Sequence, residues 1–287
     1  MRIGIDALFA IPGVNEGIVT YLRNLLKNLL EIDKKNKYII FVCKENSGTF
    51  MINNDRICEV LCPIRGSFRI LRVFWEQFIL PFQTKKYNLD LFFSPGHVFS
   101  IFCLVPTVMT IHDIYYVYYP ENVPKIELLF WHILNRLSIK KAERIITVSE
   151  SVKKDIVKTF KVKEEKVYVT YEASEECFHT NYSKEKIEAI REKYGLSKKY
   201  LLSVAIMRSN KNIARLLEAF NILKTQYQIP HQLVLVGTIN QPFKDLRQQD
   251  VILTGYVPQE DLPLLYCGAS LLVYLYFSFF RHLFKYS

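Results

Sequence analysis

The chain has 287 residues, of which 50% are hydrophobic and 14% aromatic, and its formal net charge at pH 7 is +10. This apolar content excludes an intrinsically disordered protein and allows either one large domain or two domains of ordinary size. A basic excess attracts anions in general. Because no recognised nucleic-acid-binding motif accompanies it, we expect no nucleic-acid partner.

The six cysteines and six histidines do not have the spacing of a metal site. Only Cys58 and Cys62 are close in sequence, and no second Cys or His pair follows them to complete a zinc site. Arg2 and Asp6 interrupt the apolar stretch at the start, so no signal peptide is predicted. We therefore expect free thiols, no bound metal and a cytoplasmic protein.

Strands and helices are predicted to alternate through residues 1–178. Residues 2–7 alternate as in a strand, a loop with glycines follows, and residues 18–30 place isoleucine and leucine at helical spacing. Compact apolar runs predict further strands at 38–42, 89–93, 105–111, 144–148 and 167–170. Helices are predicted at 68–80, 125–142 and 152–160. Ser149 is well placed to cap the last of these helices.

A second strand–helix series is predicted to begin at Tyr200, after a polar, lysine-rich segment at 179–199 that we assign to a linker. Strands are predicted at 200–205, 232–237, 251–255 and 271–274, with helices at 212–224 and 259–267. The predicted domains are thus 1–178 and 200–287. Two such series predict an α/β protein with two doubly wound parallel sheets facing a cleft, and ligands at the carboxyl ends of the strands.

Five stretches, in order, give the chain its resemblance to glycosyltransferase family 4. They are RIGIDA with the helix GIVTYLRNLL, FWEQFILP at 74–81, TIHDIYYVYYPE at 110–121, AERIITVSESVKKDI at 142–156, and the pair YLLSVAIMRSNKNIARLLEAF at 200–220 and VILTGYVPQEDLPLLYCGA at 251–269. The resemblance implies the GT-B fold of two Rossmann-like domains. It also implies an acceptor site in the first domain, a nucleotide-sugar site in the second, and a retaining transfer that needs no metal or other cofactor.

His112, at the end of a predicted strand, matches the histidine of the family's His-Asp motif, and the resemblance implies a catalytic role beside the transferred sugar. Without the resemblance, a histidine that caps strand and loop is the simpler interpretation. Asp113 and Tyr115 follow it as candidates for the acceptor side. The tyrosines of this segment either line an acceptor site or pack in the core, and the sequence does not choose.

Gly17, Asn210 and Lys211 are the candidates for donor binding. Gly17 lies where a loop enters a helix, and Lys211 directly precedes one, so both lie near helix N-termini that favour phosphate. The alternatives are that Gly17 only allows a turn and that Lys211 is a solvent-exposed lysine without a ligand. The family often has a second glycine where this chain has Val19, and it usually has Arg-Lys where this chain has Asn210-Lys211.

The sequence therefore predicts transfer of a hexose, mannose or glucose, from a GDP- or UDP-linked donor to a glycan or lipid-linked acceptor. The predicted helix 68–80, with Arg69, Arg72 and Trp75, either rests on the inner face of an anionic membrane or is buried. After residue 274 the family pattern stops, and we expect an incomplete second domain and impaired transfer. The alternative is a non-catalytic remnant that binds an acceptor or a partner.

Overall fold

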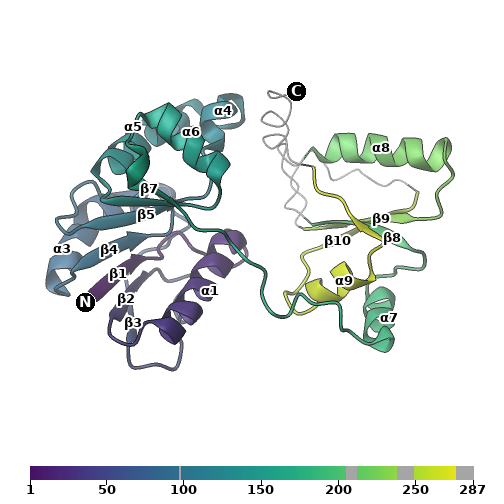
Figure 1. Cartoon of the computed structure of the whole chain (residues 1–287), viewed down its shortest axis with the longest axis horizontal. Coiled ribbons are helices and arrows are strands. Elements are labelled where there is room, and N and C mark those ends of the chain that lie inside the picture. Colours follow the sequence, from purple (N-terminus) through teal and green to yellow (C-terminus); the bar gives the residue numbers. More distant parts are fainter. Residues whose placement is uncertain (97, 205–211, 238–248, 276–287) are drawn as a thin grey trace. The chain divides into compact units, whose positions relative to one another are not determined.

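The computed structural model describes residues 1–96, 98–204, 212–237 and 249–275. They form two compact units, Met1–Glu172 and Ala173–Ser287, each built on its own parallel sheet (Figure 1). The predicted α/β class, with one doubly wound sheet in each half of the chain, is confirmed.

The first unit contains a seven-stranded parallel sheet in the order β3-β2-β1-β4-β5-β6-β7. Its strands are β1 Arg2–Asp6, β2 Lys37–Val42, β3 Ile57–Leu61, β4 Leu91–Ser94, β5 Thr107–Ile111, β6 Arg144–Thr147 and β7 Val167–Val169. The strand order reverses between β1 and β4. In doubly wound folds, ligands bind outside the carboxyl ends of the strands at such a reversal.

Helices cover both faces of this sheet. They are α1 Glu16–Ile32, α2 Arg69–Phe74, the π-helical turn Trp75–Ile79, α3 Leu80–Lys86, α4 Tyr115–Tyr118, α5 Lys125–Lys141 and α6 Glu150–Phe160. Helix α1 buries Val19, Leu22, Leu26 and Leu30 on one face, against a cluster that includes Ile5 and Ile40. Helices α3, α5 and α6 bury their apolar residues on the other face.

The helix predicted at 68–80 is longer than expected and has three parts. It continues past Pro81 to Lys86, because the proline lies in the first turn of α3, just after the π-helical turn. Strand β3 was not predicted from the sequence. Its residue Glu59 accepts the backbone N–H groups of Gly48 and Phe50 at 2.7 and 2.9 Å, which ties the preceding loop to the strand.

The second unit contains a four-stranded parallel sheet in the order β10-β9-β8-β11. Its strands are β8 Tyr200–Val204, β9 Gln232–Val236, β10 Val251–Gly255 and β11 Leu271–Leu272, and its helices are α7 Lys184–Lys193, α8 Ile213–Thr225 and α9 Leu262–Gly268. Helix α7 lies within the segment 179–199 that we assigned to a linker. Its Ile190 is buried in one core with Tyr200, Leu202 and Leu265, so this segment is part of the second unit's fold.

The predicted cap of α6 is confirmed, since the Ser149 hydroxyl accepts the N–H of Val152 at 3.3 Å. Within the described ranges, no helix has both the length and the apolar character needed to cross a membrane.

Candidate active site

His112 directly follows β5, at the carboxyl edge of the first unit's sheet. Its Nε2 lies 3.1 Å from the carbonyl oxygen of Pro95, in the loop after β4, and its Nδ1 lies 3.3 Å from Oε1 of Glu172. The ring of Tyr21, from α1, meets the imidazole edge to face at 4.8 Å. The Tyr21 hydroxyl lies 3.2 Å from Oγ1 of Thr110 on β5. Three other segments therefore contact the ring of this histidine and fix its orientation: the loop after β4, the segment that carries Glu172, and α1.

The two partners of the His112 ring are both hydrogen-bond acceptors. A carbonyl oxygen and a carboxylate each accept a hydrogen bond from a ring N–H. The hydrogen bond from His112 holds the pKa of Glu172 below its ordinary value, although partial desolvation works in the opposite direction. His112 therefore lies between a carbonyl oxygen and an ionised carboxylate.

Asp113 and Tyr115 help to form the turn that follows. Oδ1 of Asp113 accepts the N–H of Tyr115 at 3.0 Å, where α4 begins, and the Tyr115 ring stacks on Tyr119 at 5.0 Å. Tyr116 is buried, and desolvation raises the pKa of its hydroxyl to about 12. Tyr116 therefore packs in the core, whereas a contact of Asp113 or Tyr115 with an acceptor stays a prediction.

Gly17 is exposed in the first turn of α1, and a Cβ added there would meet no atom within 4 Å. There is room for a ligand beside it. In the preceding loop, however, the N–H of Gly13 donates to Oε1 of Glu16 at 2.6 Å, so a carboxylate already lies at this helix start. Val19 points inward and is fully buried, so it replaces the family's second glycine with a core residue. Asn210 and Lys211 lie outside the described residues.

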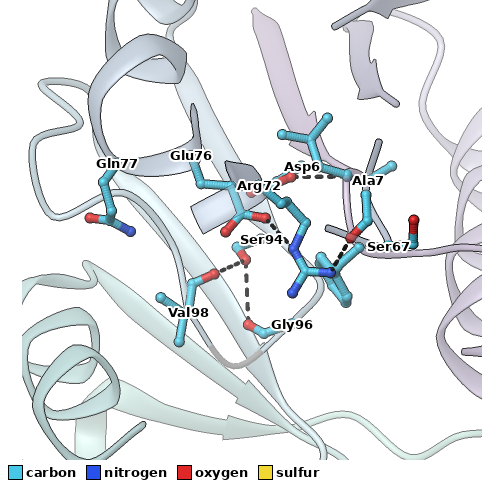
Figure 2. Close-up of polar contacts among 12 residues, drawn as sticks. Asp6, Ala7, Ser67, Arg72, Glu76, Gln77, Ser94, Gly96 and Val98 are labelled. Carbon is cyan, nitrogen blue, oxygen red and sulfur yellow. Dashed lines mark hydrogen bonds and ion pairs between the residues drawn. The ribbon is translucent and has the colours of Figure 1, made fainter. Parts of the chain in front are cut away.

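Sequence reasoning missed a buried charged cluster at the end of β1, made of Asp6, Arg72 and Glu76 (Figure 2). Nε of Arg72 lies 3.2 Å from Oε1 of Glu76, and Nη1 donates to the carbonyl oxygen of Gly66 at 3.0 Å. Oδ1 of Asp6 accepts the N–H of Leu8 at 3.1 Å, while among the described residues its Oδ2 has no hydrogen-bond partner.

The cluster contains two acids and only one cation. Desolvation raises the pKa of Asp6 to about 6, although the Leu8 N–H and the charge of Arg72 act against it. Desolvation, followed by repulsion from Asp6, raises the pKa of Glu76 well above its ordinary value. Near neutral pH the two acids therefore do not both ionise readily. The pairing of Arg72 and Glu76 at i,i+4 inside an apolar helix was the signal available in the sequence.

Ser94 lies beside this cluster, at the end of β4. Its buried hydroxyl donates toward the carbonyl oxygens of Gly96 and Val98, at 3.3 and 2.9 Å, and so shapes the loop after β4 (Figure 2). The carbonyl group that His112 contacts, Pro95, belongs to the same loop. The polar groups at the ends of β1, β4 and β5 thus all lie at the carboxyl edge of the sheet.

Two family profiles match the chain and together cover most of it. The profile described as "Glycosyltransferase Family 4" matches residues 15–173, and the one described as "Glycosyl transferases group 1" matches residues 186–277. The chain therefore belongs to glycosyltransferase family 4, in the group 1 glycosyltransferases.

Curated relatives include three bacterial mannosyltransferases. The O-antigen chain mannosyltransferase B of Escherichia coli is 29% identical over 176 residues, which are 58% of this chain and 46% of that protein. The O-antigen chain mannosyltransferase RfbU of Salmonella typhimurium is 28% identical over 173 residues, 58% of this chain and 44% of the relative. The serotype-specific mannosyltransferase WbdA of Escherichia coli is 26% identical over 154 residues, 49% of this chain and 19% of the relative. The chain thus spans less than half the length of these relatives.

Solved structures share the fold at low sequence identity. The lipopolysaccharide glycosyltransferase WaaG aligns with a TM-score of 0.71 at 13% identity, over 96% of this chain and 75% of WaaG. Anabaena Alr3699/HepE in complex with UDP and glucose aligns with a TM-score of 0.68 at 16% identity, over 96% of this chain and 74% of that one. These likenesses show the GT-B fold.

Proposed function

We propose that the protein is a retaining glycosyltransferase that moves a hexose from a nucleotide sugar to a glycan or lipid-linked acceptor. The observation that carries the proposal is His112, held at the carboxyl edge of the sheet by the Pro95 carbonyl oxygen and the Glu172 carboxylate. The names of the curated relatives favour mannose as the hexose, and we propose GDP-mannose as its donor. The neighbour solved with UDP-glucose supports a UDP-linked glucose donor as the second choice.

Departure of the nucleoside diphosphate leaves negative charge on phosphate and positive charge on the sugar. The protein lowers the barrier by stabilising both charges more strongly in the transition state than in the bound donor. We assign the phosphate to Lys211, next to the N-terminus of α8, and to the N-terminal turn of α1 at Gly17. Asn210, beside Lys211, is the further donor-binding candidate.

His112 acts on the sugar. The ionised Glu172 carboxylate beside the ring does not oppose the positive charge that develops on the sugar, and we assign the His112 backbone carbonyl to face that charge. The Nδ1–Glu172 contact is long, at 3.3 Å, and the Glu172 side chain is 54% exposed, so a sugar hydroxyl can enter as an additional acceptor. Asp113 and Tyr115 are assigned to the acceptor side. This mechanism needs neither a metal ion nor another cofactor.

A transfer assay tests the proposal. The purified 287-residue chain is incubated separately with GDP-mannose and UDP-glucose, and release of GDP or UDP and the anomeric configuration of the product are measured, with and without EDTA. We expect turnover of at least one donor with retention of configuration and no loss in EDTA. His112→Ala should reduce turnover by about 100-fold or more, whereas His132→Ala, on the exposed side of α5, should not change it.

Three results would contradict the proposal. Product with inverted configuration would exclude the retaining mechanism, and loss of turnover in EDTA would exclude metal independence. Glycan binding by a chain that neither binds GDP or UDP nor releases them from the donors would instead identify a non-catalytic binding protein.

We place this activity in the cytoplasm at the inner face of a membrane, where a lipid-linked acceptor is found. The support for this location is the exposed apolar surface on α2, α3 and α5.

A further inference from the structure

The first unit has a row of phenylalanines on its surface that do not pack into its hydrophobic core. The rings of Phe74 and Phe78 lie 5.0 Å apart, and Phe78 stacks on Phe102 at 5.4 Å. All three side chains are about half exposed. We call Phe74, Phe78 and Phe102 the aromatic ridge. Apolar side chains that are even more exposed extend it, namely Ile70 at 88%, Phe82 at 73% and Leu104 at 84%. Soluble proteins rarely expose a contiguous apolar area of this kind without a binding role.

Buried hydrogen bonds hold the backbone that carries the aromatic ridge. The buried Gln77 accepts the N–H of Ile101 at 3.0 Å and donates to the carbonyl oxygen of Phe99 at 3.2 Å, which fixes the loop that carries Phe102. Ser100 donates to the Gln77 carbonyl oxygen at 3.0 Å. The rings therefore project from an ordered framework, and they are ready to be buried without further ordering of the backbone.

Helix α5 continues the apolar surface. Leu129, Ile133 and Leu137 repeat every four residues along it, and all three are exposed. Helix α5 is joined to α2 by the ion pair between Arg69 and Glu127, and the Arg69 guanidinium lies 4.5 Å from the centre of the Trp131 ring. Since α3 and α5 cover the same face of the sheet, their exposed sides both point away from it.

A cluster of cations borders the aromatic ridge, and we call it the basic rim. It surrounds a shallow hollow and consists of Lys140, Lys141, Arg144, Lys161, Lys163 and Lys166. The ammonium group of Lys141 donates to the carbonyl oxygen of Ile101, one residue before Phe102, so rim and ridge are in direct contact. Only two acids, Glu143 and Glu165, line the same hollow.

The ridge loop and the basic rim belong to the amino edge of the sheet. Residues 101–104 precede β5, Lys140 and Lys141 precede β6, and Lys161–Lys166 precede β7. Parallel strands place all of these segments at one edge, opposite the carboxyl edge where His112 lies. A surface that covers the ridge and the rim therefore leaves His112 uncovered.

We infer that the aromatic ridge and the basic rim together form a docking surface for an anionic lipid bilayer. Exposed rings enter the boundary between headgroups and acyl chains, and lysines at the border pair with anionic headgroups. A second copy of the chain is a poorer occupant, because it brings a second set of cations against the basic rim. The inference deepens the proposed membrane location and in that respect rests on the proposed function.

Vesicle co-sedimentation tests the inference without any sugar substrate. The full chain is mixed with vesicles of phosphatidylcholine, alone or with phosphatidylglycerol, at low and high salt. We expect binding to the anionic vesicles and weaker binding at high salt. Phe78→Ser with Phe102→Ser should lower partitioning by about tenfold or more. Lys140→Gln with Lys163→Gln should lower it about fivefold for each lysine.

Matched controls lie on α1, which covers the other face of the sheet. Ile32→Ser removes an apolar side chain that is 79% exposed, and Lys27→Gln removes an exposed cation, so neither should change vesicle binding. Far-UV circular dichroism of each variant checks that it is folded. Equal binding by ridge variants and wild type, or no binding to anionic vesicles, would overturn the inference. A dimer in solution that Phe78→Ser dissociates would also overturn it, in favour of self-association.

The two proposals can fail separately. If the ridge variants no longer bind vesicles but still release GDP or UDP from a donor in solution, both the docking surface and the transferase survive. If vesicle binding follows the prediction while no donor is turned over, the transferase fails and the docking surface stands.

Discussion

At the scale of single residues, the pairing of His112 with Glu172 predicts how that carboxylate titrates. His112→Ala removes the N–H that holds the pKa of Glu172 down, so this pKa should rise toward its ordinary value near 4.5. Carbon-13 NMR of the side-chain carboxyl group measures the change directly. A variant in which Glu172 titrates as in the wild type would show that the contact contributes nothing.

The sign of the effect on stability follows from the same shift. A carboxyl group whose pKa is lower in the folded chain than in the unfolded chain stabilises the fold at any pH above its unfolded pKa. This stabilisation is lost as the pH falls through the pKa of the folded chain. The wild type should therefore lose more stability than His112→Ala on acidification below about pH 4.5. Since Glu172 is half exposed, solvent screening keeps this difference small.

The second prediction at this scale concerns Arg72. Arg72→Met leaves Asp6 and Glu76 buried without a cation, and removing one partner of a buried ionic cluster costs about 3–5 kcal/mol at neutral pH. The pKa of Asp6 is 3.8 in the unfolded chain and is raised to about 6 in the folded protein. The folded state therefore becomes less stable as Asp6 ionises, while the pH rises from 3.8 through 6. The loss in the variant should therefore be larger at pH 7 than at pH 4.

Urea denaturation at both pH values measures this difference, with the exposed Arg65→Met as the control that removes a neighbouring cation. An equal loss of stability at pH 4 and pH 7 would mean that packing of the Arg72 side chain, rather than its charge, accounts for the effect.

The candidate site was predictable only in part, for reasons visible in single residues. His112 ends an apolar run, and topology alone places such a residue at the carboxyl edge of a parallel sheet. Glu172 carries no comparable signal, because it is 60 residues from His112 in sequence and in an irregular segment. Asp6 and Glu76 meet only through tertiary packing, so sequence spacing does not reveal their proximity.

At the scale of elements, the segment from α2 to α3 depends on one buried amide. Gln77→Met deletes both of its side-chain hydrogen bonds and leaves the N–H of Ile101 and the carbonyl oxygen of Phe99 without this partner. An unsatisfied buried group costs about 1–3 kcal/mol, so we expect a loss of roughly 2–4 kcal/mol in unfolding free energy.

Chemical denaturation measures the loss, and Gln83→Met is the matched control. Oε1 of Gln83 is buried and has no hydrogen-bond partner among the described residues, so replacing this amide should cost little. Equal losses in the two variants would show that side-chain shape matters more here than hydrogen bonding.

The elements that the sequence predicted well are those with both a clear period and a buried face. Helix α1 and strands β1, β2 and β4 through β7 follow apolar patterns that burial requires. Strand β3 has Cys58 and Glu59 next to each other between Ile57 and Val60, so it shows no clear period, and Glu59 accepts hydrogen bonds from the neighbouring loop. Helix α7 buries Ile190 alone, so its composition resembles that of a linker although it packs on a sheet.

At the scale of the whole molecule, each unit has its own hydrophobic clusters. Ile5 on β1 is fully buried in one cluster of the first unit, and Leu202 on β8 is fully buried in one cluster of the second. We expect Ile5→Ala and Leu202→Ala each to cost about 2–5 kcal/mol, with the effect limited to the unit that contains the substitution.

Hydrogen exchange followed by mass spectrometry distinguishes the two units in the intact chain. Ile5→Ala should accelerate exchange in β1, β2 and β4 and leave β8 and β9 unchanged, and Leu202→Ala should have the reverse pattern. Independent cores predict this reciprocity, because a lost side chain weakens only the cluster that it helps to fill. If either substitution accelerated exchange in both sheets equally, the two units would unfold as a single cooperative body.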